Sequence, residues 1–153
     1  MTLEQARVRE AIRFTIELYN RNADTADYER HREVFHPEAQ MDVQGGEALH
    51  GPDAIIAAMR AGAQKRDAFA PGNFQRHHLT SIMIEQQAPD RANASIYVMV
   101  FTELGLDHAG GYDDEYRPLG DRWLLYRRAA RMEWARPDSR FVRWLGAAQE
   151  ARA

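Results

Sequence analysis

The chain has 153 residues, of which 44% are hydrophobic and 28% charged, and its formal net charge is −3. This length and composition fit one globular domain, and the small negative charge argues against a nucleic-acid-binding surface. The absence of cysteine excludes disulfides, thiolate metal sites and cysteine nucleophiles.

The chain begins with MTLEQARVREAIRF, a charged stretch without the continuous apolar core of a signal peptide. Nowhere do about 18 apolar residues follow one another, as a membrane-spanning helix requires. We therefore expect a cytoplasmic protein with neither a membrane nor a nucleic acid as a partner.

Helices are predicted in the first half of the chain. Thr2 and Gln5 have the spacing of a capping box, and apolar residues at helical spacing extend this first helix to about Asn22. A proline in the first helical turn, Pro52, begins a helix that continues to about Ala63. Between them we predict a short helix over residues 27–35 and a short strand over residues 39–43.

Strands are predicted in the second half of the chain. Apolar and β-branched residues separated by turn signals indicate four strands, over residues 74–87, 92–104, 110–117 and 122–134. Helices followed by a strand meander define an α+β fold, with the helices packed on one side of a curved antiparallel or mixed sheet. The mouth of such a cone is a natural pocket for a small molecule.

Opposite charges face each other across the last predicted hairpin: Asp113, Asp114 and Glu115 against Arg127, Arg128 and Arg131. Each cross-strand pair of this kind contributes about 0.2–1 kcal/mol. We interpret them as setting the strand register.

The predicted domain covers residues 1–135 and leaves a tail over residues 136–153. The tail carries Phe141, Val142, Trp144 and Leu145 at the spacing of a short helix, which covers either its own domain or a neighbouring subunit. Residues 94–104 are apolar on both strand faces, which is typical of a strand buried on both sides. We expect a homo-oligomer, a trimer or a dimer.

Two adjacent histidines, His77 and His78, lie on one predicted strand and therefore point to opposite faces. For that reason they do not present two ligands to one metal, and neither do His31 and His36, five residues apart. No metal, phosphate or dinucleotide motif is present. The remaining enzymatic possibility is a site without metal or cofactor.

Strand periodicity alone does not decide which histidine points inward. His78 shares a face with Ile82 and Ile84, whereas His77 shares one with Leu79 and Met83. A histidine here is either a structural residue or a general base. Asp24, near the end of the first helix, is either a cap or the carboxylate that fixes the tautomer of an imidazole.

Three stretches carry a family resemblance: LYNRNADTADYERHREVFHPEAQMDV, RHHLTS and GGYDDEYRPLGDRWLLYRRAARMEW. Together they resemble the SnoaL-like branch of the nuclear transport factor 2-like superfamily, which includes scytalone dehydratase and hexachlorocyclohexane dehydrochlorinase. The resemblance spans residues 11–134 and implies a cone-shaped α+β barrel. It also implies an aspartate and a histidine that remove a proton without metal or cofactor.

The resemblance selects particular residues. The family's aspartate matches Asp24 in the stretch DTADY, and its histidine matches His78 in HLTS. His78 is therefore the expected base and Asp24 its partner, and His77 is left on the other face. Arg117 loosely matches an arginine of the dehydrochlorinase.

The substrate-binding groups of the family differ in this chain. Ala23 and Val43 stand where scytalone dehydratase has tyrosines, and Thr102 stands near the position of a second family histidine. Tyr19 and Tyr28 are each a candidate proton donor or a core aromatic. Val43, Thr102, Tyr19, Tyr28 and Arg117 are therefore the expected substrate-binding residues.

These inferences predict a cofactor-independent lyase acting on an apolar, aromatic or cyclic small molecule, with loss of water, halide or a small carbonyl fragment such as formaldehyde. Two alternatives remain open. One is an isomerase, cyclase or hydroxylase with the same fold, and the other is a noncatalytic binding or assembly module.

Overall fold

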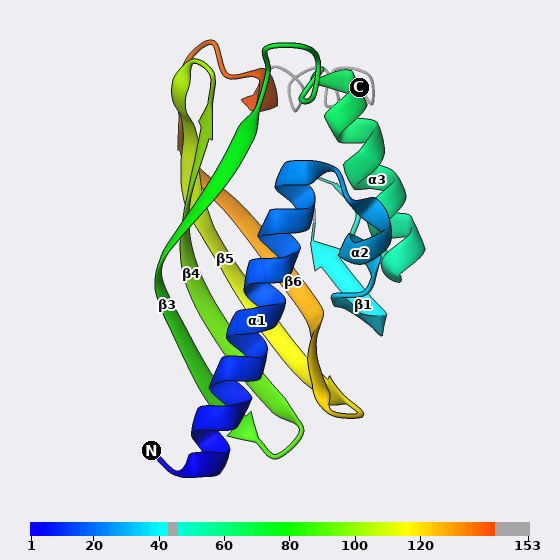
Figure 1. Cartoon of the computed structure of the whole chain (residues 1–153), viewed down its shortest axis with the longest axis vertical. Helices are drawn as coiled ribbons and strands as arrows, with labels where there is room; N and C mark the ends of the chain where they lie inside the picture. The colour runs from blue at the N-terminus through cyan, green and yellow to red at the C-terminus, as the bar shows by residue number, and fades with distance from the viewer. Residues whose placement is uncertain (43–45, 143–153) are drawn as a thin grey trace.

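The structure is a computed structural model and describes residues 1–42 and 46–142. Figure 1 shows a curved sheet of long strands with the first helix lying across its concave side. The second and third helices and the first strand close one side of that concavity. Helices on one side of a sheet are the α+β arrangement expected from the sequence.

Helix α1 (Leu3–Thr25) begins at the predicted capping box. The Thr2 side chain accepts a hydrogen bond from the Gln5 backbone, and the Gln5 side chain accepts one from the Thr2 backbone. The helix continues three residues beyond the predicted end and stops where Ala26 adopts a left-handed φ of 56°. Asp24 therefore lies in the last helical turn.

The segment after α1 differs from the sequence prediction. Helix α2 (Tyr28–Arg32) is shorter than expected, because strand β1 (Phe35–Asp42) already begins at Phe35. The backbone of Val34 accepts a hydrogen bond from Leu125, so pairing with a distant strand overrides helical propensity here. Strand β2 (Leu49–His50) was not predicted. Helix α3 (Pro52–Lys65) confirms the helix predicted to begin at Pro52.

Four long strands form the rest of the sheet: β3 (Gln75–Ala88), β4 (Arg91–Thr102), β5 (Gly105–Leu119) and β6 (Arg122–Ala135). The strand order is β2-β1-β6-β5-β4-β3, and only the β1–β6 pair is parallel. The sheet is therefore mixed and open, with β2 and β3 at its edges. The α+β class is confirmed, whereas the expected barrel is a curved sheet that does not close.

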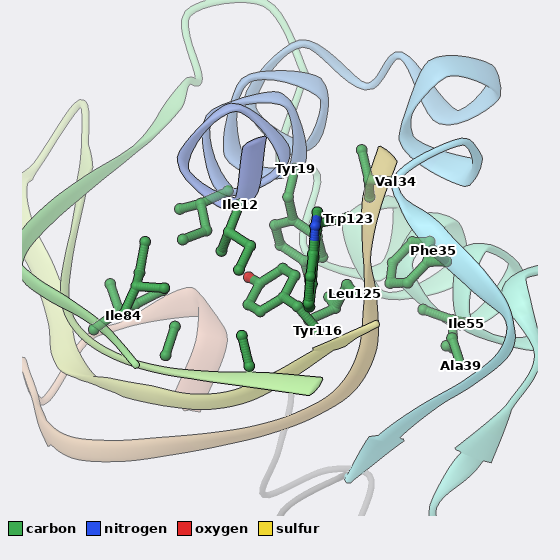
Figure 2. Packing of buried hydrophobic residues seen from close by; sticks show 14 of the residues in the cluster. Ile12, Tyr19, Val34, Phe35, Ala39, Ile55, Ile84, Tyr116, Trp123 and Leu125 are labelled. Carbon is green, nitrogen blue, oxygen red and sulfur yellow. The ribbon is translucent and has the colours of Figure 1, made fainter. Parts of the chain in front are cut away.

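The hydrophobic core fills the space between α1 and the concave sheet face (Figure 2). Ile12 and Ile16 of α1 are fully buried, and so is Ile96 of β4. At about 25 cal/mol for each Å² of apolar surface removed from water, such side chains contribute about 1.5–3 kcal/mol each. This packing fixes α1 against the sheet and so determines where its last turn, with Asp24, meets β3.

A β-bulge at Ser81 divides β3 into two parts. Thr80 pairs with Tyr97 and Met83 with Ser95, so three steps along β3 correspond to two along β4, and Ser81 has a φ of 49°. Side chains that face the core are odd-numbered before the bulge, as at Leu79, and even-numbered after it, as at Ile84. A one-residue shift reverses the face of every following side chain.

The pair of Asp114 and Arg128 is part of the core. Both side chains are almost fully buried, with 0% and 1% exposure. The Arg128 guanidinium donates two hydrogen bonds to the Asp114 carboxylate, at 2.8 and 2.6 Å, and the Tyr116 hydroxyl donates a third at 2.8 Å. Asp114 and Arg128 lie directly opposite each other on β5 and β6, as expected for a register-setting pair, but they are buried inside the concavity rather than exposed on the surface.

Within residues 1–42 and 46–142, none of the helices combines the length and the apolar character that crossing a bilayer requires.

Candidate functional site

The last turn of α1 is joined to the first residues of β3 by hydrogen bonds. The Gln75 side chain donates to the carbonyl of Ala23 at 3.3 Å, and the His77 backbone N–H donates to the Asp24 carboxylate at 3.0 Å. A helix end leaves carbonyl groups without helical partners, and the Gln75 contact satisfies part of that deficit. The result is a fixed position for the Asp24 carboxylate beside β3.

The imidazole of His77 lies directly against this carboxylate. Its Nδ1 is 2.6 Å from Oδ1 of Asp24, while Oδ2 of the same group accepts the backbone hydrogen bond. A carboxylate accepts hydrogen bonds, so Nδ1 carries a proton, and in the neutral ring the lone pair is on Nε2. The two side chains are 15% and 10% exposed, so the pair is shielded from solvent but still within reach of a ligand.

The predicted pairing of Asp24 with His78 is therefore wrong, and the partner is His77. His78 is exposed on the convex face, where its ring meets Phe101 edge-on at 5.0 Å. The prediction placed His78 on the same face as Ile82 and Ile84, but the bulge at Ser81 shifts those residues by one position. The local match to the family stretch HLTS was one residue out of register.

A third histidine, His31, lies close to the pair and has 0% exposure. Its ring packs edge-on against Tyr19 at 4.4 Å and stacks on Phe35 at 5.6 Å. Within the described residues neither of its ring nitrogens has a hydrogen-bond partner. Burial, together with the charges of Arg128 and His77, lowers the pKa of His31 to about 3.

The buried His31 makes the stability of the protein depend on pH. In the unfolded chain a histidine takes up a proton near pH 6.5, whereas native His31 stays neutral down to about pH 3. The unfolded state thus binds the extra proton between these values, so the free energy of unfolding falls as the pH is lowered, by up to about 1.4 kcal/mol per pH unit. In a His31→Phe variant this part of the acid sensitivity is expected to disappear.

Chemical denaturation at several pH values between 4.5 and 7.5 measures this effect. The exposed His50 offers a matched control, since a His50→Gln variant is expected to keep the wild-type pH dependence. Equal slopes for wild type and His31→Phe would contradict the assignment.

A pocket opens beside the pair, at the end of the concavity near the C-terminal segment. Its cavity volume is about 30 Å³, and about 340 Å³ is empty when the space open to solvent is counted. Its wall includes Gln75, Val100, Thr102 and His108 of the sheet, together with Arg66 after α3 and Phe141 of the C-terminal segment. His77 adjoins this wall, because it lies two residues from Gln75 on the same face and pairs with Val100.

The residues expected to bind substrate lie in different parts of the structure. Thr102 lines the pocket. Tyr19 is a core residue, 6% exposed, with the Arg128 guanidinium 3.9 Å above its ring. Tyr28 is half-buried at the start of α2, with Arg60 4.9 Å above its ring. Val43 lies outside the described residues.

Arg117 is not brought to the site. Its guanidinium donates to Glu115 at 2.7 Å and lies 3.4 Å above the ring of Tyr126. It is nine residues along β5 from the pocket residue His108, which corresponds to about 30 Å of strand. The predicted role of Arg117 in binding substrate is therefore wrong.

Two further residues lie near the pair: Tyr112, and His108, which the sequence reasoning missed. Burial raises the pKa of Tyr112 well above its usual value, and the Asp24 carboxylate adds to this effect, so its hydroxyl stays protonated. His108 belongs to the pocket wall and pairs in register with Val100, the partner of His77. The sequence signal for it was the polar doublet Asp107-His108 directly after a turn.

Among the residues that the structure describes, no group of three or more His, Asp or Glu side chains is arranged to hold a metal ion. The site therefore offers an imidazole base positioned by a carboxylate, a neutral phenol nearby and a pocket with mixed apolar and polar walls. This arrangement is able to remove a proton from a bound organic molecule.

Comparison with protein families identifies the class to which this fold and site belong. The SnoaL-like domain matches residues 4–129, and the chain therefore belongs to the SnoaL-like family. A search of curated proteins finds no match.

Several solved structures have the same fold. A candidate scytalone dehydratase from Novosphingobium aromaticivorans is 18% identical with a TM-score of 0.70, covering 84% of this chain and 85% of its own. A hexachlorocyclohexane dehydrochlorinase of type 2 is 16% identical with a TM-score of 0.73, covering 88% and 91%. A nuclear transport factor 2-like protein with a cystatin-like fold, also from N. aromaticivorans, is 24% identical with a TM-score of 0.73, covering 90% of each chain.

Proposed function

We propose that this protein is a cofactor-independent lyase in which His77, positioned by Asp24, is the general base. The observation that carries the proposal is the 2.6 Å contact between Nδ1 of His77 and the Asp24 carboxylate. This contact holds the proton on Nδ1 and leaves the lone pair of Nε2 to accept a proton from substrate. The chain belongs to the SnoaL-like family, and the solved structures with the same fold include a hexachlorocyclohexane dehydrochlorinase, an enzyme named for an elimination reaction. This similarity also supports an elimination.

The proposed reaction is an elimination. Nε2 of His77 takes a proton from a carbon of the substrate, the electrons of that C–H bond form a C=C double bond, and the bond to the leaving group breaks. A halide departs with the bonding electrons, whereas a hydroxyl leaves as water after taking the proton back from the imidazolium. The Asp24 carboxylate and the negative end of helix α1 both stabilise that imidazolium.

The substrate class follows from the walls of the pocket. Phe74, Val100 and Phe141 supply apolar surface beside polar and charged residues of the same wall, among them Arg66, Thr102 and His108. We therefore propose an aromatic or cyclic molecule with an activated C–H or O–H bond. Water or halide leaves when the proton comes from carbon. A small carbonyl fragment such as formaldehyde leaves when Nε2 instead takes the hydroxyl proton of a hydroxymethyl group beside a carbonyl: the O–H electrons form the C=O bond of formaldehyde, the C–C bond breaks, and its electrons give an enolate that takes the proton back from the imidazolium.

A substrate screen tests the proposal. Cyclic β-hydroxy ketones, halocyclohexanes and hydroxymethyl ketones cover the three leaving groups, and the products are followed by conjugated-alkene absorbance, halide release and formaldehyde release. Turnover by wild type is expected to fall to background in His77→Ala. The neighbouring His78→Ala is the matched control and is expected to keep the wild-type rate, because His78 faces away from the pocket.

Three outcomes of this screen would count against the proposal. Turnover that survives in His77→Ala would exclude His77 as the base. Tight binding of these compounds without any turnover would favour the noncatalytic binding module. Isomerised or cyclised products that depend on His77 would assign the same base to another reaction class.

We also propose that the protein is a homo-oligomer, a dimer or a trimer, through the convex face of the sheet. Large apolar side chains lie exposed there: Met83 and Tyr97 are each 55% exposed, and Trp134 is 50% exposed. Apolar surface of this kind on a sheet face is typical of an interaction site. Light scattering at micromolar concentration is expected to give two or three times the chain mass, and a single-chain mass would contradict the proposal.

A further inference from the structure

A histidine–carboxylate pair other than Asp24–His77 lies in the pocket wall itself, formed by the neighbouring residues Asp107 and His108. Nδ1 of His108 is 2.7 Å from Oδ2 of Asp107. Neighbouring strand residues normally point to opposite faces, but β5 has a bulge here: Phe101 pairs with Leu106 and Val100 with His108. Asp107 is the extra residue of the bulge, and this places its carboxylate beside the next side chain.

The proton on His108 is located by the other contact of Asp107. The backbone N–H groups of Phe141 and Val142 donate to Oγ of Ser139, so the hydroxyl proton of Ser139 is left to donate to Oδ2 of Asp107, at 2.7 Å. Oδ2 of Asp107 is therefore an acceptor, and Nδ1 of His108 must donate to it. Ser139 is fully buried and contacts Asp107 rather than His108, so it is not a nucleophile.

The other ring nitrogen of His108 remains available to a ligand. Burial lowers the pKa of His108 more than the adjacent Asp107 raises it, and the charges of His77 and Arg66 lower it further, so the imidazole is neutral at neutral pH. Nε2 then has a lone pair and no proton. In the described part of the chain Nε2 makes no hydrogen bond with another residue, and the side chain belongs to the pocket wall.

His108 and His77 face the same space. His77 pairs with Val100 and Val100 pairs with His108, so the three lie side by side on the concave face of β3, β4 and β5. Two strand spacings, about 10 Å, separate the outer two backbones. One small ring lying over Val100 is therefore within reach of both imidazoles.

We propose that His108 is a specificity-determining residue that accepts a hydrogen bond from a hydroxyl group of the substrate, and that the substrate is a phenol or a similarly acidic alcohol. A fixed acceptor favours a donor such as O–H and disfavours a halogen, an ether or a carbonyl at the same place. The inference rests on the proposed function in one respect, because it takes the pocket beside His77 to be the substrate site.

Binding measurements on the folded full-length protein test this assignment without requiring turnover. 4-Ethylphenol and 1-ethyl-4-fluorobenzene have nearly the same shape, but only the phenol is a donor. NMR titrations are expected to show wild type binding the phenol about tenfold more tightly, as one satisfied hydrogen bond in a shielded site implies. In His108→Leu the preference is expected to disappear.

The Asp107→Ala variant gives a second test. It removes the oxygen that holds the imidazole proton on Nδ1, so the proton is free to move to Nε2 and the fixed acceptor in the pocket is lost. The variant is expected to lose the preference for 4-ethylphenol. Asp107→Asn is the matched control and is expected to keep it, because its amide oxygen is able to take the place of Oδ2 and accept from both Ser139 and His108. A merely structural role of Asp107 would weaken both probes alike.

The outcomes separate this inference from the proposed function. His77→Ala is expected to lose turnover but keep the preference for the phenol, because the acceptor is His108. Equal binding of phenol and fluorobenzene by wild type, failure of both to bind, or an unchanged preference in His108→Leu would each overturn the role of His108. None of these results bears on whether turnover depends on His77. The role of His108 and the proposed lyase reaction are therefore tested separately.

Discussion

Replacement of Asp114 by alanine is expected to lower the free energy of unfolding by about 3–5 kcal/mol, because it leaves a charged guanidinium without its counter-ion in the core. Arg128 and Asp114 are 1% and 0% exposed, and the carboxylate accepts two hydrogen bonds from Arg128 and one from Tyr116. Burial lowers the pKa of Arg128, and the Asp114 carboxylate more than offsets this and raises it well above its usual value. An arginine side chain does not lose its proton in a protein, so the guanidinium stays charged in the core when the carboxylate is removed.

The neighbouring acidic residue offers a matched control for this experiment. Asp113 forms an ion pair with Arg131 on the solvent side of the sheet, where the two side chains are 60% and 40% exposed. Exposed pairs contribute about 0–1 kcal/mol, so Asp113→Ala is expected to have little effect. Denaturant unfolding of the two variants measures the difference, and equal losses of stability would show that Asp114 does not hold Arg128 as described.

Replacement of Asp24 by asparagine is expected to reduce kcat by about 10³–10⁴ while leaving the fold intact. The asparagine oxygen is able to keep the hydrogen bond from the His77 backbone, but its amide N–H then faces Nδ1 of the ring. Nδ1 becomes the acceptor, the imidazole proton moves to Nε2, and the base that faces the substrate is lost. The thermal midpoint is expected to change far less than the rate.

Asp27 provides the control, because it lies three residues away and caps α2 by accepting the backbone N–H of Arg30 at 3.2 Å. Asparagine is as good an N-cap as aspartate, so Asp27→Asn is expected to keep both rate and stability. The comparison uses whichever substrate the screen identifies, with initial rates measured for both variants. An Asp24→Asn enzyme within threefold of the wild-type rate would show that the carboxylate does not direct the tautomer of His77.

The sequence predicted much of the fold because the relevant signals are local. A capping box at Thr2 begins α1, a proline in the first turn begins α3, and turn residues separate the long strands. The boundaries that it predicted incorrectly depend on distant partners. Phe35 is part of a strand rather than a helix, because β1 pairs with β6 almost 90 residues later in the chain.

The candidate site was predicted in part, for a similar reason. Asp24 was identified from its place at the end of a helix and from the family stretch around it. The choice between His77 and His78 depended on the face of β3, and the bulge at Ser81 reverses that face without a recognisable local signal. The bulge at Asp107 likewise placed His108 in the pocket beside its carboxylate.

The state of the His77 ring is the most direct test of the proposed site, and it needs no substrate. In ¹⁵N NMR of histidine-labelled protein at pH 8, His77 is expected to carry its proton on Nδ1 and to have a bare Nε2. In Asp24→Asn the proton is expected to move to Nε2. A wild-type His77 with its proton on Nε2, or a ring that does not respond to the Asp24 substitution, would contradict the proposal that Asp24 prepares His77 as the base.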